Sequence, residues 1–201
     1  MTPTHQAWLL DLDGTLYRPF GVKLLMGFEL LASPRAIPLL RTFRKEHEKL
    51  REQAFESDDL SPFEEQVART ASLLSISPDR VRATVLRFMV DAPGRWIRLF
   101  RRKELLEEIS DYRASGGKTA LVSDYPARAK LQALGAESLF DIVVANGEDG
   151  GPNALKPSPA GYLSAARRLG VPPERCLVIG DREDADGQAA RRAGMAFRLV
   201  R

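Results

Sequence analysis

The stretch that decides the fold reads Trp8-Leu9-Leu10-Asp11-Leu12-Asp13-Gly14-Thr15-Leu16-Tyr17. Its apolar beginning, residues 7–10, predicts a short buried strand that ends in turn chemistry at Gly14. The strand delivers two carboxylates, Asp11 and Asp13, one residue apart. Because such carboxylates repel each other, proteins place them where a cation or a developing charge uses them. The alternative is a solvated junction between a strand and a loop.

Size and composition exclude several classes of protein. A chain of 201 residues, 44% hydrophobic and 28% charged, can form one sizeable α/β core with a helical appendage. No apolar run approaches the ~20 residues of a membrane span, and no signal region precedes the first strand, so we expect a cytoplasmic protein without a membrane partner. The single cysteine, Cys176, predicts a buried small hydrophobe.

The net charge of +3 is small, and acidic residues are interleaved with the basic ones. A nucleic-acid-binding protein would usually carry a denser basic stripe with aromatic residues in it. We therefore expect no nucleic-acid partner, and a mild attraction to anionic substrates.

The second half of the chain alternates between strand and helix patterns. The predicted strands are residues 118–122, 140–145, 176–179 and 196–200, and the predicted helices are residues 127–134, 159–169 and 185–193. This alternation predicts an α/β fold in which helices cover both faces of a parallel sheet.

Residues 18–100, here called the helical insertion, carry helix signals. Apolar positions recur at helical spacing in Ala36, Leu40, Phe43, His47, Leu50 and Ala54. Ser61-Pro62 and Ser77-Pro78 are typical helix starts, and Pro93-Gly94 predicts a break. The predicted organisation is a catalytic core of residues 1–17 and 101–201, interrupted by the insertion after the first strand.

Three predicted strands are followed by polar side chains: Asp11 and Asp13 come after residues 7–10, Ser123 after residues 118–122 and Asp181 after residues 176–179. Ligands bind outside the carboxyl ends of strands in open parallel sheets, so these groups should gather in one crevice. Lys156 joins them from a loop before a helix start, a favourable place for an anion. Oxygen ligands without a histidine or cysteine cluster favour Mg²⁺ bridging to a phosphate.

These residues resemble, in order, the four motifs of the haloacid dehalogenase superfamily. The matching segments are Asp11-Leu12-Asp13-Gly14-Thr15, Ser123, Leu155-Lys156-Pro157 and Gly180-Asp181. The resemblance implies a Rossmann-like core with a mobile helical cap in the position of the insertion. In the phosphotransferase branch of that superfamily it also implies an aspartyl-phosphate intermediate and Mg²⁺.

The resemblance implies a role for each matching residue. Asp11 would be the nucleophile, and Asp13 would protonate the leaving alcohol and then activate water. Ser123 would bind phosphoryl oxygens, and Lys156 would offset their charge. Asp11, the backbone carbonyl of Asp13 and Asp181 would hold Mg²⁺.

Asp184 and Asp186 follow the last motif, and we expect both to act from outside the metal's ligand set. Members of the superfamily that remove halides lack an acid at the position of Asp13, so its presence favours phosphoryl transfer. The predicted function is a phosphatase of small phosphorylated metabolites. A sugar-phosphate mutase and a non-catalytic binding or regulatory protein are the alternatives.

Several assignments stay open at this stage. His47 fits either a packing role or a substrate contact. Arg95, Trp96 and Arg98 fit a hinge or phosphate-steering role as well as a solvated face with a packing tryptophan. The substrate and the oligomeric state are also open.

Overall fold

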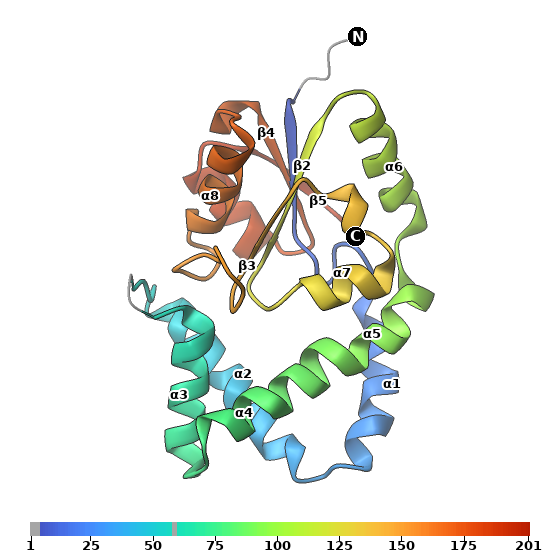
Figure 1. The fold of residues 1–201 in the computed structure, drawn as a ribbon. Helices are drawn as coiled ribbons and strands as arrows, with labels where there is room; N and C mark the ends of the chain where they lie inside the picture. Colours follow the sequence, from blue (N-terminus) through green and yellow to red (C-terminus); the bar gives the residue numbers. More distant parts are fainter. Residues whose placement is uncertain (1–4, 58–59) are drawn as a thin grey trace.

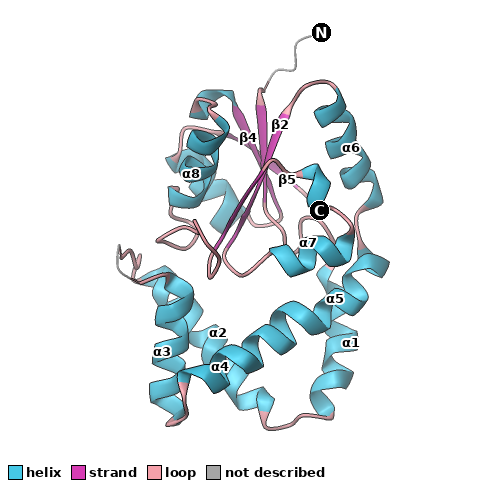
Figure 2. Ribbon diagram, viewed as in Figure 1, coloured by secondary structure: helices cyan, strands magenta, loops and turns pink. Residues whose placement is uncertain are grey.

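The computed structural model describes residues 5–57 and 60–201, so residues 1–4 of the predicted core and 58–59 of the insertion lie outside the described residues. The described part of the chain forms a five-stranded parallel sheet in the order β3-β2-β1-β4-β5 (Figures 1 and 2). The strands are β1 Ala7–Leu10, β2 Lys118–Ser123, β3 Ile142–Ala145, β4 Cys176–Gly180 and β5 Ala196–Leu199. This sheet confirms the predicted Rossmann-like α/β fold.

Both faces of the sheet are buried, as the continuous apolar run of β1 predicts. Leu10 contributes to one face, which packs against the helical residues Ile109 and Leu131, whereas Leu9 contributes to the other, with Tyr162. The helices that flank the sheet are α6 Lys103–Ala114, α7 Arg128–Leu134, α8 Ala160–Leu169 and α9 Gln188–Arg192, with short turns η3 Glu137–Leu139, η4 Pro173–Arg175 and η5 Glu183–Gly187.

The helical insertion lies against the carboxyl ends of the strands, below the sheet in Figure 1. Its elements are α1 Pro19–Leu31, α2 Ala36–Glu52, α3 Pro62–Leu74, α4 Pro78–Val85, η1 Leu86–Asp91, α5 Ala92–Ile97 and η2 Arg98–Phe100. Two of the predicted helix starts are present: the hydroxyl of Ser61 accepts from the N–H of Glu64, and that of Ser77 from the N–H of Arg80. No helix of the described residues is both long and apolar enough for a bilayer span.

Two details of the insertion differ from the predictions. The predicted break at Pro93-Gly94 is wrong, because the chain stays helical through α4, η1, α5 and η2. The π-helical segment η1 ends at Asp91, two residues before Pro93, which stands in the first turn of α5. Such widened turns accommodate a residue without an N–H. Ala54 lies beyond the end of α2 with a φ of 48°, so the apolar stripe of α2 ends at Leu50.

The chain enters and leaves the insertion through two paired segments. The N–H of Arg18 donates to the carbonyl of Phe100 (2.8 Å), and the N–H of Arg102 donates to that of Leu16 (2.9 Å). The interior of the insertion, including Phe43, is continuous with the apolar face of the sheet that contains Leu10. The insertion therefore packs directly on the end of the sheet where the strands have their carboxyl ends.

His47 belongs to the contact between α2 and the loop after β2. Its ring stacks on that of Tyr125 with centroids 4.7 Å apart, and its Nδ1 lies 3.3 Å from Oε1 of Gln66. Gln66 in turn donates to the carbonyl of Phe43 (2.6 Å). These contacts favour the packing interpretation, and burial lowers the pKa of His47 below its usual 6.5.

This burial predicts a pH-dependent contribution of His47 to stability. Below about pH 6.5 the unfolded chain binds a proton at His47 more readily than the fold does, so stability falls with acidification by up to about 1.4 kcal/mol per pH unit. His47→Gln keeps a polar side chain but cannot titrate. Urea unfolding should show a larger loss between neutral and mildly acidic pH in the wild type than in the variant. Equal losses would contradict this account of His47.

Candidate active site

The strand register brings the predicted site residues to one edge of the sheet. Leu10 pairs with Leu121 of β2 and with Ile179 of β4, so β1 lies between these two strands and ends within two residues of the level at which they end. Asp11, Ser123 and Asp181 therefore occupy neighbouring positions at or just past the strands' carboxyl ends. The sequence prediction placed all three in one crevice on this argument alone.

Asp11 is buried and held through both carboxylate oxygens. Its Oδ1 accepts from Nζ of Lys156 at 2.6 Å, and its Oδ2 accepts from the hydroxyl of Thr15 at 3.0 Å. Nζ of Lys156 also lies 2.9 Å from Oδ1 of Asp186. One buried ammonium thus joins two carboxylates that come from opposite ends of the chain.

A cluster of three acids surrounds this ion pair. Carboxylate oxygens of Asp11, Asp181 and Asp186 all lie within 4.8 Å of one another. The wide π turn η5 returns the chain to the site after Asp181, and Asp186 is held there by the hydroxyl of Tyr162 (2.8 Å) and the N–H of Arg182 (3.2 Å).

The two acids for which we expected outer roles are therefore placed differently from each other. Asp186 lies inside the acidic cluster, whereas Asp184 is mostly exposed and pairs with the guanidinium of Arg182. The side chain of Asp13, which is part of the predicted metal set through its backbone carbonyl only, does not belong to the cluster that the described residues form.

The electrostatics of the cluster fit a bound cation. Burial raises the pKa of Asp11 above its usual value, and the charges of Asp186 and Asp181 add to this effect against the opposing pull of Lys156. Burial and Asp186 likewise raise the pKa of Asp181. A divalent cation would relieve the mutual repulsion, and an all-oxygen donor set suits Mg²⁺.

Gly14 makes room for this arrangement. Its φ of +100° is a conformation that favours glycine, and a Cβ at this position would overlap the carboxylate of Asp181. The glycine of the first motif is thus required by the acid of the last one.

Asp13 is engaged by residues outside the cluster. Nζ of Lys130 lies 2.7 Å from both of its carboxylate oxygens, and the hydroxyl of Tyr17 donates to one of them. Lys130 is buried on α7, although a lysine close to Arg128 is typical of a solvated helix face. In the sequence, Lys130 lies four residues before Leu134 and so on the same helix face. That spacing is too weak a signal to assign a role to Lys130.

Ser123 and Lys156 are connected through the loop after β2. Ser123 is buried, and its hydroxyl accepts from the N–H of Tyr125 (3.2 Å), which forms the turn. Oδ1 of Asp124 accepts from the backbone N–H of Lys156 (3.1 Å). Asp124 therefore fixes the loop that presents the Lys156 ammonium.

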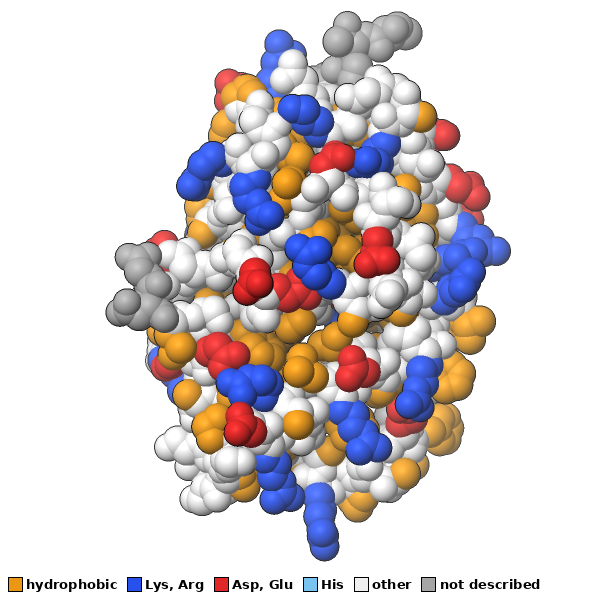
Figure 3. Space-filling model, in the orientation of Figure 1, with side chains coloured by type: hydrophobic (Ala, Val, Ile, Leu, Met, Phe, Trp, Pro, Cys, Tyr) orange, Lys and Arg blue, Asp and Glu red, His pale blue; other side chains and the backbone are white. Residues whose placement is uncertain are grey.

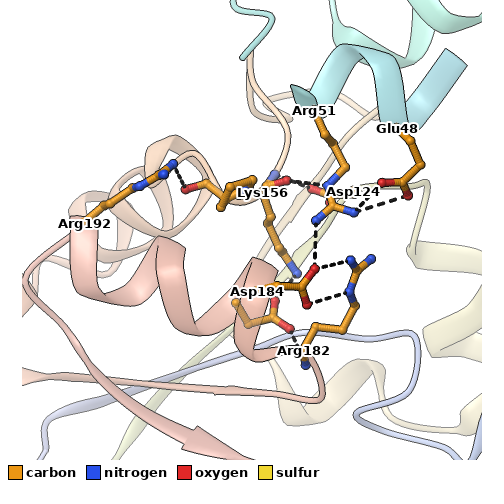
Figure 4. A network of polar contacts seen from close by, with 9 residues as sticks. Glu48, Arg51, Asp124, Lys156, Arg182, Asp184 and Arg192 are labelled. Atoms are coloured by element: carbon orange, nitrogen blue, oxygen red, sulfur yellow. Dashed lines mark hydrogen bonds and ion pairs between the residues drawn. The ribbon is translucent and has the colours of Figure 1, made fainter. Parts of the chain in front are cut away.

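The insertion reaches the site through Arg51, which the sequence analysis did not single out. Nε of Arg51 donates to the carbonyl of Lys156 (2.8 Å), and Nη2 lies 3.9 Å from a carboxylate oxygen of Asp184 (Figure 4). The guanidinium also pairs with Glu48 one turn earlier on α2. Arg51 follows His47 by one helical turn, so one face of α2 carries both contacts to the core.

Arg95 and Trp96 contact α1. The indole N–H of Trp96 donates to Glu29 (2.9 Å), and the Arg95 guanidinium lies 3.9 Å from the same carboxylate. Trp96 therefore packs between α5 and α1, whereas the side chain of Arg95 is 73% exposed and lies on a solvated face.

Comparison with known sequences agrees with the site. A family model described as haloacid dehalogenase-like hydrolase matches residues 5–194. A glyceraldehyde 3-phosphate phosphatase of Methanopyrus kandleri is 44% identical over 72 residues, which make up 36% of this chain and 30% of that protein. A phosphoglycolate phosphatase of Aquifex aeolicus is 36% identical over 91 residues, 44% of this chain and 41% of that protein. The matches thus span less than half of these relatives' lengths.

Comparison with solved structures agrees with the fold. The crystal structure of a HAD phosphatase from Thermococcus onnurineus aligns with a TM-score of 0.59 at 20% identity, over 98% of this chain and 86% of that chain. Since the family model spans almost the whole chain and the four motifs meet at one sheet edge, this protein belongs to the haloacid dehalogenase-like hydrolases.

Proposed function

We propose that this chain is a Mg²⁺-dependent phosphatase that hydrolyses small phosphate monoesters through a phosphorylated Asp11. The observation that carries the proposal is the buried Asp11 carboxylate, held by Lys156 beside two further acids. This arrangement combines a nucleophile, a cation that attracts phosphate and a set of oxygen ligands. The phosphatase names of the sequence relatives support the same reaction class.

In the first proposed step, an Asp11 oxygen bonds to phosphorus while the bond from phosphorus to the substrate's ester oxygen breaks. Asp13 gives its proton to the departing alkoxide, and Ser123 and Lys156 bind the transferring phosphoryl oxygens. In the second step, Asp13 takes a proton from water, the water oxygen bonds to phosphorus, and the bond to Asp11 breaks. Inorganic phosphate leaves and both aspartates return to their starting state.

Asp11 and Asp181 would hold Mg²⁺ together with the backbone carbonyl of Asp13. Asp186 lies within reach of the same ion and also fixes the position of Lys156. When bound, the ion would offset the negative charge of the phosphoryl group and of the carboxylates around it.

The proposed substrate is a small phosphorylated metabolite. Residues 18–100 would form a cap over a core made of residues 1–17 and 101–201, and Arg51 ties that cap to the Lys156 loop. A roof at the carboxyl edge of the sheet excludes water and admits a metabolite more readily than a folded protein. A mutase would share Asp11 and Asp13, and the names of the relatives favour hydrolysis.

Asp11→Asn tests the nucleophile, because an amide cannot form the acyl phosphate. We expect phosphate release from an aryl phosphate in the presence of Mg²⁺ to fall by at least about a thousandfold, with the far-ultraviolet circular dichroism unchanged. Asp149→Asn, an exposed acid far along the chain, is the matched control and should keep wild-type turnover. Retention of a tenth of the wild-type turnover by Asp11→Asn would overturn the proposal.

Lys130→Met tests whether Lys130 positions Asp13. Without the ammonium, the Asp13 carboxylate loses the contacts that orient it, so we expect kcat to fall about tenfold or more while KM changes little. Lys130→Arg keeps a cation and should recover part of the loss. A wild-type kcat in Lys130→Met would show that this ion pair has no part in turnover.

A further inference from the structure

Helix α1 has an apolar face that no described residue of the chain covers. Phe20 is 80% exposed, Leu24 57%, Phe28 65% and Leu31 71%, and Leu99 in the neighbouring η2 is 71% exposed. These five residues and Gly27 are here called the α1 face. Figure 3 shows hydrophobic side chains along the lower right edge of the molecule, where Figure 1 places α1. The opposite side of α1, with Val22 and Met26, packs into the insertion.

The size of the α1 face is close to what a stable dimer requires. At about 200 Å² for a fully exposed Phe or Leu, these fractions amount to roughly 700 Å² of mostly apolar surface. A standard protein interface buries about 800 Å² on each partner, whereas the largest apolar patch of a typical monomer is about 300–600 Å².

The spacing of the α1 face makes it complementary to itself. Phe20, Leu24, Gly27 and Leu31 are separated by four, three and four residues, a pattern that reads the same in both directions. In an antiparallel helix pair about a two-fold axis, Phe20 would lie opposite the partner's Leu31. Leu24 would then lie opposite the partner's Gly27, so a large side chain meets a notch at the centre.

Among residues 5–57 and 60–201, no contact accounts for a glycine at position 27. A Cβ at this position would have no atom within 4 Å, and a glycine inside an exposed helix costs about 1 kcal/mol relative to alanine. A notch for a partner's side chain accounts for a glycine at this place.

The charge of the α1 face favours a protein partner over a membrane surface. Lys23 is the one charged residue among the exposed positions of α1. Helices that lie on anionic lipid carry a strongly basic polar face, which α1 lacks because its other side is buried. From the area, the palindromic spacing and the low charge, we propose that the α1 face is a two-fold interface with a second copy of this chain.

Sedimentation velocity of the 201-residue chain up to about 100 µM tests this proposal. The wild type should sediment with twice the mass of one chain. Leu24→Lys and Gly27→Lys should each raise the dissociation constant at least about tenfold, because each buries a charge at the centre of the pair. Lysine favours a helix more than glycine does, so Gly27→Lys should fold at least as stably as the wild type.

Leu73→Lys is the matched control, because Leu73 is 60% exposed on α3, outside the α1 face. This variant should keep the mass of the wild-type dimer. A single-chain mass for the wild type, or an undiminished dimer in both α1 variants, would overturn the proposal. A single-chain mass together with co-sedimentation on phosphatidylserine vesicles would instead assign the face to a membrane surface and overturn it as well.

Discussion

The site depends on the buried ammonium of Lys156, which lies between Asp11 and Asp186. Removing three charges from water is costly, and the cost is offset only if each group is held in good geometry. Thr15, Tyr162 and the β1 strand end provide that geometry. Burial raises the pKa of Asp11, so a bound cation would favour its ionised form. The same buried charges that cost free energy on folding would attract a metal ion and a phosphate.

The insertion contacts the core at the two loops that carry the site residues Ser123 and Lys156. Arg51 binds the carbonyl of Lys156, and His47 stacks on Tyr125 two residues after Ser123. Movement of α2 would therefore displace the two loops that carry Ser123 and Lys156. Through these contacts, substrate binding to the proposed cap would change the positions of Ser123 and Lys156.

The sequence was sufficient for the sheet and for the meeting of Asp11, Ser123 and Asp181, because apolar strands and the residues that follow them obey simple rules of parallel sheets. It was not sufficient for Asp186, whose position depends on a π turn that no local pattern indicates. Lys130 was missed because a lysine in a helix is ordinarily solvated, and only tertiary packing turns it toward Asp13. Pro93 was misread because the preceding widened turn absorbs its missing N–H.

The central claim is that phosphate passes through the Asp11 carboxylate, and acid quenching during turnover of a ³²P-labelled phosphate ester measures this most directly. We expect a protein-bound label that is stable in acid, is released by hydroxylamine and lies on the peptide containing Asp11. Label on another residue, or turnover without labelled protein under conditions where substrate saturates the enzyme and the second step is slowed, would contradict it.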